Sequence, residues 1–450
     1  MKKQGIKSVS IFLRFFLFSF VSNVLASSST DLYMRVDGND LNAGTHYKYD
    51  AVRTLKRAFE LAKSEFQNVD TVRILVRPGI YYVGNEGESS VIDSDFIAGL
   101  TNPGRKTLVI QTHYFSSQPF ARAIFDGRTS PLDSDGSQCR LFISIDGAEA
   151  LPSSDGNVIP LPAFPKVVVR GLEFHYMKNP IRLLGSGYHE IVANRFVRIG
   201  NKYSCSGSAY AALGVSSSSN NLIIGNDFHL IENSTGVEGL HSIYISKSSS
   251  SNRILGNSFY KFSGTAIKLR DSSDDNEISF NKFFNSTMDS SNPKPAIHAN
   301  FVSQSYDECP TVGNLAKANQ MIFSPLPSLA DSGSDRLWGL WSSFSGSYDC
   351  PGRNESDGVD PWNQIIHLDD QGVEYNSEYG PGENKPYFIR TYYSDKGYNY
   401  NLVHPGDFRT YPNFGFCPSS GMCKIDNGSC IMNGDEVVGY MCSGGNLIKK

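Results

Sequence analysis

The sequence predicts an all-β solenoid, in which short strands wind into stacked coils. The first observation is a repeat of a polar turn, a short apolar run, an Asn and a Phe in SSSNNLIIGNDF (217–228), ISKSSSSNRILGNSF (245–259) and SSDDNEISFNKF (272–283). The second is the spacing of the marker phenylalanines, which is 22, 32, 31 and 24 residues along the series Phe174, Phe196, Phe228, Phe259 and Phe283. Such spacings are typical of coils that carry loops of different length.

A column of buried asparagines is the third observation. In the last four coils an Asn stands two residues before the marker Phe, at Asn194, Asn226, Asn257 and Asn281. Buried amides need hydrogen-bond partners, and stacked Asn side chains can supply them to one another. We therefore predict that these four side chains point inward in one line, within coils that run from about Lys166 to Phe283.

Outward positions follow from strand alternation. Apolar pairs precede each turn, at Ile181/Leu183, Leu213/Val215, Ile243/Ile245 and Ile267/Leu269. Because successive side chains point to opposite faces of a strand, the residues between and after them must face outward. This gives two exposed columns, Arg182, Gly214, Tyr244, Lys268 and Leu184, Ser216, Ser246, Arg270. If AIHAN (296–300) is the next coil, it adds His298 and Asn300.

The region before the repeats contains the one predicted helix. RTLKRAFELAKSEF (53–66) places its apolar residues on one face, as an amphipathic helix does. It lies between a strand-like start with a Gly/Asn/Asp turn (33–45) and an apolar segment interrupted by Pro-Gly (70–83).

The N-terminus predicts export. Residues 1–26 combine three lysines with an apolar run and end in Val-Leu-Ala, which is typical of a secretory signal peptide. Its removal takes away four cations and no acids, so the net charge changes from −4 to about −8. This charge argues against nucleic acid as a partner. No later segment has the roughly 20 apolar residues of a membrane span. We expect a secreted or periplasmic monomer.

Eight cysteines follow the signal segment, at positions 139, 205, 309, 350, 417, 423, 430 and 442. An even number in an exported chain predicts up to four disulfides, with a connectivity that the sequence leaves open. Six of the eight lie beyond residue 305, where the repeat fades and Tyr, Gly and Pro become frequent. We therefore divide the chain into the signal peptide (1–26), a solenoid domain with its cap (27–304) and an irregular region (305–450).

Taken together, YMRVDGNDLNAGT (33–45), RTLKRAFELA, DTVRILVRPGIYY (70–82) and the Asn-bearing repeats resemble secreted right-handed parallel β-helix proteins, particularly the pectate lyase and chondroitinase B/alginate lyase superfamily. The resemblance covers residues 33 to about 300. It implies that the helix caps the first coil and protects a sheet edge. It identifies a fold better than a function, because this solenoid carries lyases, hydrolases, epimerases and binding proteins.

The resemblance also implies site residues. The chondroitinase B/alginate lyase group has a Lys one coil before an Arg, in the form K-S-x-x-N…N-x-F…G-x-x-x-x-R, and here Lys247 and Arg270 stand in that order with one extra residue in each spacer. Members that bind calcium carry closely spaced acids upstream of the Lys. Only Glu238 stands there in this chain, so Glu238 is the candidate ligand and Ca²⁺ the candidate cofactor.

Cleavage of a uronate polymer by β-elimination needs a group that neutralises the carboxylate, a base and an acid. We assign catalytic roles to Lys247, Arg270, Lys268 and His298, and substrate binding to Tyr244, Arg182 and Asn300. Arg clamps carboxylates, and a Lys crowded by other cations can act as a base. An acidic polysaccharide is then the expected partner.

Two other readings remain open. Outward positions of a solenoid often carry Lys, Arg and Tyr without a task, so a noncatalytic protein that binds glycans is the alternative. An inverting hydrolase would need paired acids on one stripe, whereas the inferred stripe is basic. Asp274, Asp275 and His189 align with turn residues of neighbouring coils and are interpreted as structural.

Overall fold

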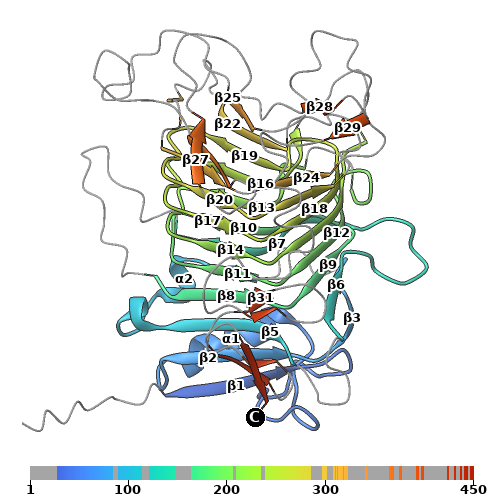
Figure 1. Cartoon of the computed structure of the whole chain (residues 1–450). Helices are drawn as coiled ribbons and strands as arrows, with labels where there is room; N and C mark the ends of the chain where they lie inside the picture. The colour runs from blue at the N-terminus through green and yellow to red at the C-terminus, as the bar shows by residue number, and fades with distance from the viewer. Residues whose placement is uncertain are drawn as a thin grey trace, which may run out of the picture.

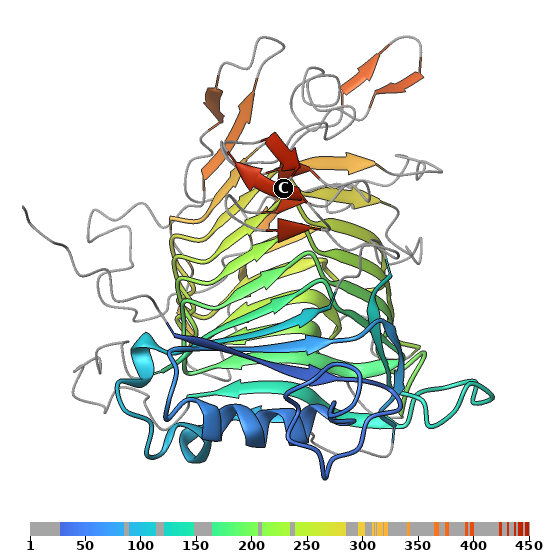
Figure 2. The same ribbon diagram turned by 90° about the horizontal axis from the view of Figure 1, so that it is seen from below.

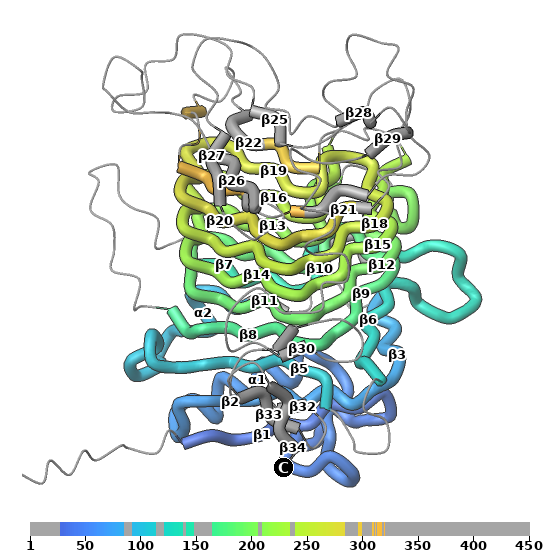
Figure 3. The backbone as a smooth tube through the Cα atoms, viewed as in Figure 1, coloured from blue at the N-terminus to red at the C-terminus, as the bar shows by residue number. Residues whose placement is uncertain are grey.

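The chain forms a right-handed parallel β-helix, as predicted (Figure 1). The computed structural model describes residues 28–84, 90–113, 121–147, 164–205, 209–234, 239–284 and 296–301, and beyond them short segments between 308 and 449. Figure 3 shows the backbone winding coil upon coil from the N-terminal end upward.

Three sheets build the wall of the solenoid. The first contains β1 (Ser29–Met34), β2 (Thr71–Val76), β5 (Thr107–Thr112), β8 (Lys166–Arg170), β11 (Glu190–Val192), β14 (Leu222–Ile224), β17 (Arg253–Leu255), β20 (Glu277–Ser279), β23 (Leu315–Lys317), β26 (Gln364–Leu368) and β27 (Glu374–Ser377). The second contains β4 (Ser90–Ile92), β7 (Gln138–Asp146), β10 (Met177–Leu184), β13 (Ala211–Ser216), β16 (His241–Ser246), β19 (Ile267–Arg270), β22 (Ile297–Phe301) and β25 (Leu340–Ser342). The third contains β3 (Gly79–Tyr82), β6 (Ala123–Asp126), β9 (Glu173–His175), β12 (Arg195–Ile199), β15 (Asp227–Ile231), β18 (Ser258–Phe262), β21 (Lys282–Phe284) and β24 (Gln320–Ile322).

The marker phenylalanines form one buried stack through the third sheet. Phe196 and Phe228 lie 4.7 Å apart between ring centroids with planes 3° apart, and Phe228 and Phe259 lie 5.0 Å apart. Phe174 and Phe283 continue the stack at its two ends. Offset stacking of this kind adds to the free energy gained by burying the rings, and it fixes the register of successive coils.

The predicted asparagine column is confirmed. The Nδ2 atom of each Asn donates to the Oδ1 atom of the next, at 3.1 Å from Asn194 to Asn226, 2.9 Å from Asn226 to Asn257 and 3.0 Å from Asn257 to Asn281. All four side chains are buried. The ladder continues one coil further to Asn319.

A second buried ladder was not predicted. Asn221, Asn252, Asn276 and Asn314 stand just before the strands of the first sheet and are linked by Nδ2–Oδ1 bonds of 2.8–3.0 Å. The first three follow turns that contain serines, so the sequence pattern marks them as turn residues. His189 takes the equivalent place one coil earlier and donates its backbone N–H to Asn221 at 2.9 Å. Complete burial lowers the pKa of His189 to about 3, which fits the structural role assigned to it.

Replacing Asn257 by Ala is expected to lower the free energy of unfolding by about 3 kcal/mol, because it strips partners from buried polar groups. The Nδ2 atom donates to Asn281 and to the carbonyl of Ile223 at 3.0 Å each, and Oδ1 accepts from the backbone and side chain of Asn226. Urea unfolding measures the loss. Ser134→Ala, on an exposed turn, is the control, and equal stability of both variants would contradict a structural ladder.

The N-terminal helix caps the solenoid at one end, as predicted (Figure 2). Helix α1 spans Leu55–Glu65, and the side chain of Thr54 accepts a hydrogen bond from the Arg57 N–H at its start. Its buried face packs against the first coils through Leu55 and Phe59. Two shorter helical segments, α2 (Ser94–Ile97) and η1 (Pro103–Arg105), lie in the next connections.

The solenoid runs past the expected boundary at residue 304. β23 and β24 pair in parallel with β20 and β21, and β25 and β26 add to the next coil. Beyond β27, short antiparallel strands are described, namely β28 (Tyr392–Ser394), β29 (Gly397–Asn399), β30 (Cys423–Lys424), β31 (Cys430–Ile431), β32 (Glu436–Val437), β33 (Tyr440–Ser443) and β34 (Asn446–Lys449). Long connections hide the period here from sequence inspection.

Cys205 and Cys309 each take part in a disulfide bond. Within the described part of the chain, no helix combines the length and apolarity that crossing a membrane requires.

Candidate active-site groove

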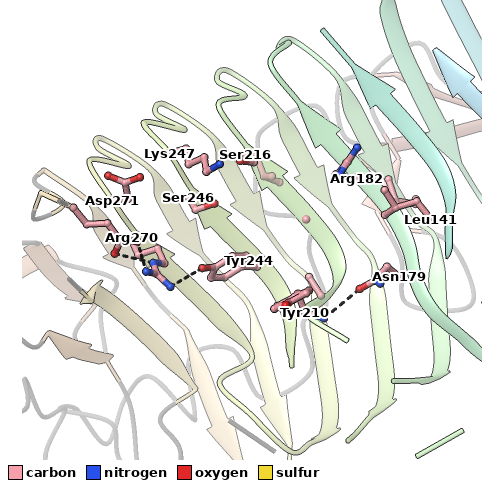
Figure 4. Close-up of a pocket in the computed structure, with 15 residues that line it drawn as sticks. Leu141, Asn179, Arg182, Tyr210, Ser216, Tyr244, Ser246, Lys247, Arg270 and Asp271 are labelled. Carbon is pink, nitrogen blue, oxygen red and sulfur yellow. Dashed lines mark hydrogen bonds and ion pairs between the residues drawn. The ribbon is translucent and has the colours of Figure 1, made fainter. Parts of the chain in front are cut away.

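A groove of about 660 Å³ lies on the outer face of the second sheet, across β7, β10, β13, β16 and β19 (Figure 4). The side chains that shape its chemistry are Asn179, Arg182, Tyr210, Ser216, Tyr244, Ser246, Lys247, Arg270, Asp271 and Glu308. Gly214 lies at its centre.

The strand register that places these residues is the predicted one. Arg182 pairs with Gly214, Gly214 with Tyr244, Tyr244 with Lys268, and Lys268 with His298. The flanking apolar residues, Ile181/Leu183 to Ile267/Leu269, are buried. Alternation therefore turns the intervening side chains outward.

Arg270 is held by two neighbours rather than standing open. Its Nε and Nη2 atoms donate to the two carboxylate oxygens of Glu308, the Nε contact at 2.9 Å, and its Nη1 atom donates to the Tyr244 hydroxyl at 3.0 Å. The Arg270 and Glu308 side chains are only 15% and 8% exposed. Arg270, which we expected to be unburied, is thus partly buried and already bonded to Glu308 and Tyr244. A bidentate pair instead fixes the guanidinium as a support for Tyr244.

Tyr244 presents a hydroxyl group that is oriented by this support. Burial raises the pKa of Tyr244, and the charge and hydrogen bond of Arg270 offset part of that rise. The phenol is therefore protonated at neutral pH. Since its oxygen accepts from Arg270, its proton is available to a group in the groove.

Asp271 and Glu308 are groove residues that the sequence analysis missed. Asp271 follows β19 directly, in the left-handed region at φ 53°. Glu308 arrives from a distant segment whose Cys309 carbonyl accepts from the Ser272 N–H at 3.0 Å. A carboxylate after a long connection leaves no mark in the repeat. The inferred stripe is therefore not simply basic.

The pKa of Asp271 is raised, first by burial and then by the charge of Glu308, while Arg270 and Lys247 act in the opposite direction. A carboxylate with a raised pKa is a stronger base than a carboxylate with the usual pKa. When it is protonated, the same carboxyl group can serve as an acid. Asp271 thus joins Tyr244 as a second group able to transfer a proton.

Lys247 lies in the turn after β16, exposed, at φ 55°. The adjoining Ser248 N–H donates to the Asp271 carbonyl at 2.8 Å, so the two turns stack directly. We expected Lys247 to act as a base because other cations would surround it. In the structure the carboxylate of Asp271 lies near it instead. Lys247 is therefore better suited to binding an anion than to removing a proton.

Other predicted site residues lie outside the groove. Lys268 and His298 continue the outward column, but they do not line the cavity, and His298 is only 4% exposed. The register shifts by one residue after Lys268, so Phe301 rather than Asn300 pairs with Arg270. This bulge breaks the simple alternation that placed Asn300.

Two further predicted site residues have side chains that the structure does not place. Those of Glu238 and Asn300 lie outside the described residues. Among the side chains that are described, no group of three or more His, Cys, Asp or Glu is arranged to hold a metal ion. We assign no step to calcium.

Arg182 forms the opposite end of the groove. Its Nη2 atom donates to Asp146 at 3.2 Å and to the Ser144 hydroxyl at 3.4 Å. Its Nε atom is buried and makes no hydrogen bond within the described residues. Tyr210, 63% exposed, lines the same end, with its backbone N–H donating to Asn179 at 3.2 Å.

One family model agrees with the fold. The family model described as "Right handed beta helix region" matches residues 144–308, which include Arg182, Tyr244 and Glu308. No curated protein matches the chain in sequence.

Several solved structures align with part or most of the chain. A rhamnogalacturonan lyase has 14% identity and a TM-score of 0.45, over 66% of this chain and 69% of its own. An alginate lyase from Paenibacillus sp. str. FPU-7 has 11% identity and a TM-score of 0.37, over 63% and 78%. ORF18 of Geobacillus virus E2 has 12% identity and a TM-score of 0.34, over 93% and 68%.

Proposed function

We propose that this chain is a secreted carbohydrate-active β-helix protein, whose groove binds an acidic polysaccharide and cleaves it by β-elimination. The observation that carries the proposal is the Tyr244 hydroxyl, held at 3.0 Å by the ion-paired Arg270 in a groove that also contains Asp271 and Lys247. An oriented acid, a carboxylate base and a cation are the three groups that the reaction needs.

Each step has a residue of suitable chemistry. Lys247 and Arg182 neutralise substrate carboxylates, which makes the neighbouring C–H bond more acidic. The Asp271 carboxylate takes the C5 proton, and the electron pair forms the C4–C5 double bond. The C4–O bond then breaks, and its oxygen receives the proton of Tyr244. Arg270 and Glu308 hold Tyr244 in place and touch no reacting atom.

The test is to incubate the protein with pectate, alginate and chondroitin sulfate, and to follow the absorbance of the unsaturated product. We expect one polymer to be cleaved with that absorbance. Parallel reactions with added calcium and with a chelator test whether calcium, for which Glu238 is the candidate ligand in the sequence, is a cofactor. If every polymer stays intact in all conditions, the lyase is contradicted and a noncatalytic glycan-binding protein is favoured.

A second candidate, hydrolysis, is favoured by the carboxyl pair itself. The pKa of Asp271 is raised, by burial and by the charge of Glu308, and a carboxyl group with a raised pKa near a second carboxylate is the pattern of the general acid and its partner in glycosidases. Cleavage in ¹⁸O-labelled water separates the two reactions. Hydrolysis adds one labelled oxygen to the product, whereas β-elimination adds none.

The pH profile gives a further prediction. As a base, Asp271 must be deprotonated, so kcat should fall as the pH drops through its raised pKa. That acid limb should lie above the usual Asp value of about 3.9. Asp271→Asn is expected to remove the limb together with most of the activity. A rate that instead falls as the pH rises through this range would contradict the base role and fit an acid.

A further inference from the structure

We propose that Gly214 forms the floor of a subsite that holds one uronate ring between Arg182 and Tyr244. The inference rests on the proposed function, because it names the place of the sugar within the same groove. Gly214 lies on β13, directly between these two residues in the outward column.

The fold does not require glycine at this position. A Cβ atom at Gly214 would lie 3.8 Å from the Arg182 Cγ atom and 4.0 Å from the Ile181 carbonyl, which are ordinary contacts. The backbone of Gly214 does not have a positive φ either, so its conformation is open to other residues. By contrast, a Cβ at Gly147 or Gly187 would come within 2.5 and 2.3 Å of a backbone oxygen. Glycine inside a strand otherwise weakens it and marks a close approach by a ligand or backbone.

The space above Gly214 matches one sugar ring. Neighbouring strands lie about 4.8 Å apart, so the backbones of Arg182 and Tyr244 are roughly 10 Å apart with the bare glycine between them. Larger side chains occupy the column on either side. The exposed ring of Tyr210 lines the same part of the groove and offers an apolar face for stacking.

The neighbouring Arg182 indicates an acidic sugar. Its guanidinium is already bound to Asp146 through Nη2, but its buried Nε atom makes no hydrogen bond within the described residues. The Arg182 side chain as a whole is 37% exposed and lines the groove, so the open part of its guanidinium can be reached by a ligand. A substrate carboxylate over Gly214 would form a charge-assisted bond there, which is stronger than a bond to a ring hydroxyl.

The test is to fill the subsite with a larger side chain at position 214. Gly214→Ala and Gly214→Leu are compared with Gly239→Leu, a matched control because a Cβ at the exposed Gly239 meets no atom within 4 Å. Isothermal titration calorimetry uses galacturonate, mannuronate and chondroitin tetrasaccharides as probes, and melting temperatures confirm folding. We expect Gly214→Leu to weaken binding by about 100-fold, Gly214→Ala to weaken it less, and Gly239→Leu to match wild type.

Two results would overturn the inference and are distinguishable. If wild type binds a probe and Gly214→Leu binds it equally well, the subsite is contradicted while the proposed function stands. If wild type neither binds nor cleaves any of the probes, the proposed function fails as well. Should Gly214→Leu melt early, Gly214→Ala and Arg182→Gln provide the test, and wild-type affinity in both would contradict the subsite.

Discussion

Replacing Tyr244 by Phe is expected to lower kcat for the cleaved polymer by about 10²–10⁴-fold, the usual contribution of a positioned proton donor. The change removes the hydroxyl that Arg270 orients at 3.0 Å and keeps the ring. The free energy of unfolding should fall by only about 1 kcal/mol, since Arg270 keeps both contacts to Glu308. Steady-state kinetics and urea unfolding measure the two quantities.

The matched control is Tyr260→Phe, which changes a tyrosine of β18 on the third sheet that stacks on His229. It should retain wild-type turnover. Full activity of Tyr244→Phe would remove this hydroxyl from the mechanism. Equal losses in both variants would show that the effect is not specific to the groove.

The second large effect concerns stability. Glu308→Ala is expected to lower the free energy of unfolding by about 3–5 kcal/mol, because it leaves the largely buried cation of Arg270 without its carboxylate. Arg270→Ala should be destabilising for the converse reason. Activity should fall in both variants, since Tyr244 loses its support.

The double variant Arg270→Met/Glu308→Leu separates the two roles of the pair. Apolar replacement of a buried ion pair is often neutral or stabilising, so this variant should recover most of the stability. It should not recover turnover, because Tyr244 remains without its donor. A Glu308→Ala protein as stable as wild type would contradict the buried pair.

Periodicity made most of the solenoid predictable. Residues equivalent to Asn257 and Phe259 recur in successive coils, and equivalent positions of stacked coils share the same buried surroundings. The second asparagine ladder was not predicted, because Asn252 follows four serines and therefore resembles a turn residue. We placed the end of the solenoid at residue 304 because the sequence period is lost there. The period is interrupted by long connections, such as the one between β24 and β25, although the solenoid continues.

The site was predictable only where it depends on strand alternation. Arg182 and Tyr244 were placed correctly, because parity within a strand and register between strands decide their direction. His298 obeys the parity, yet it is buried, and the register shifts by one residue after Lys268. Glu308 could not be found in this way, because no repeat aligns a residue that arrives from a connecting segment.

The location of the active site is tested most directly by a crystal structure of Tyr244→Phe with an oligosaccharide of the polymer that wild type cleaves. We predict a uronate ring over Gly214, with its carboxylate at the guanidinium of Arg182 and the bond to be cleaved beside residue 244 and Asp271. An oligosaccharide bound on another sheet, with the groove of β10, β13, β16 and β19 left open, would contradict the central claim.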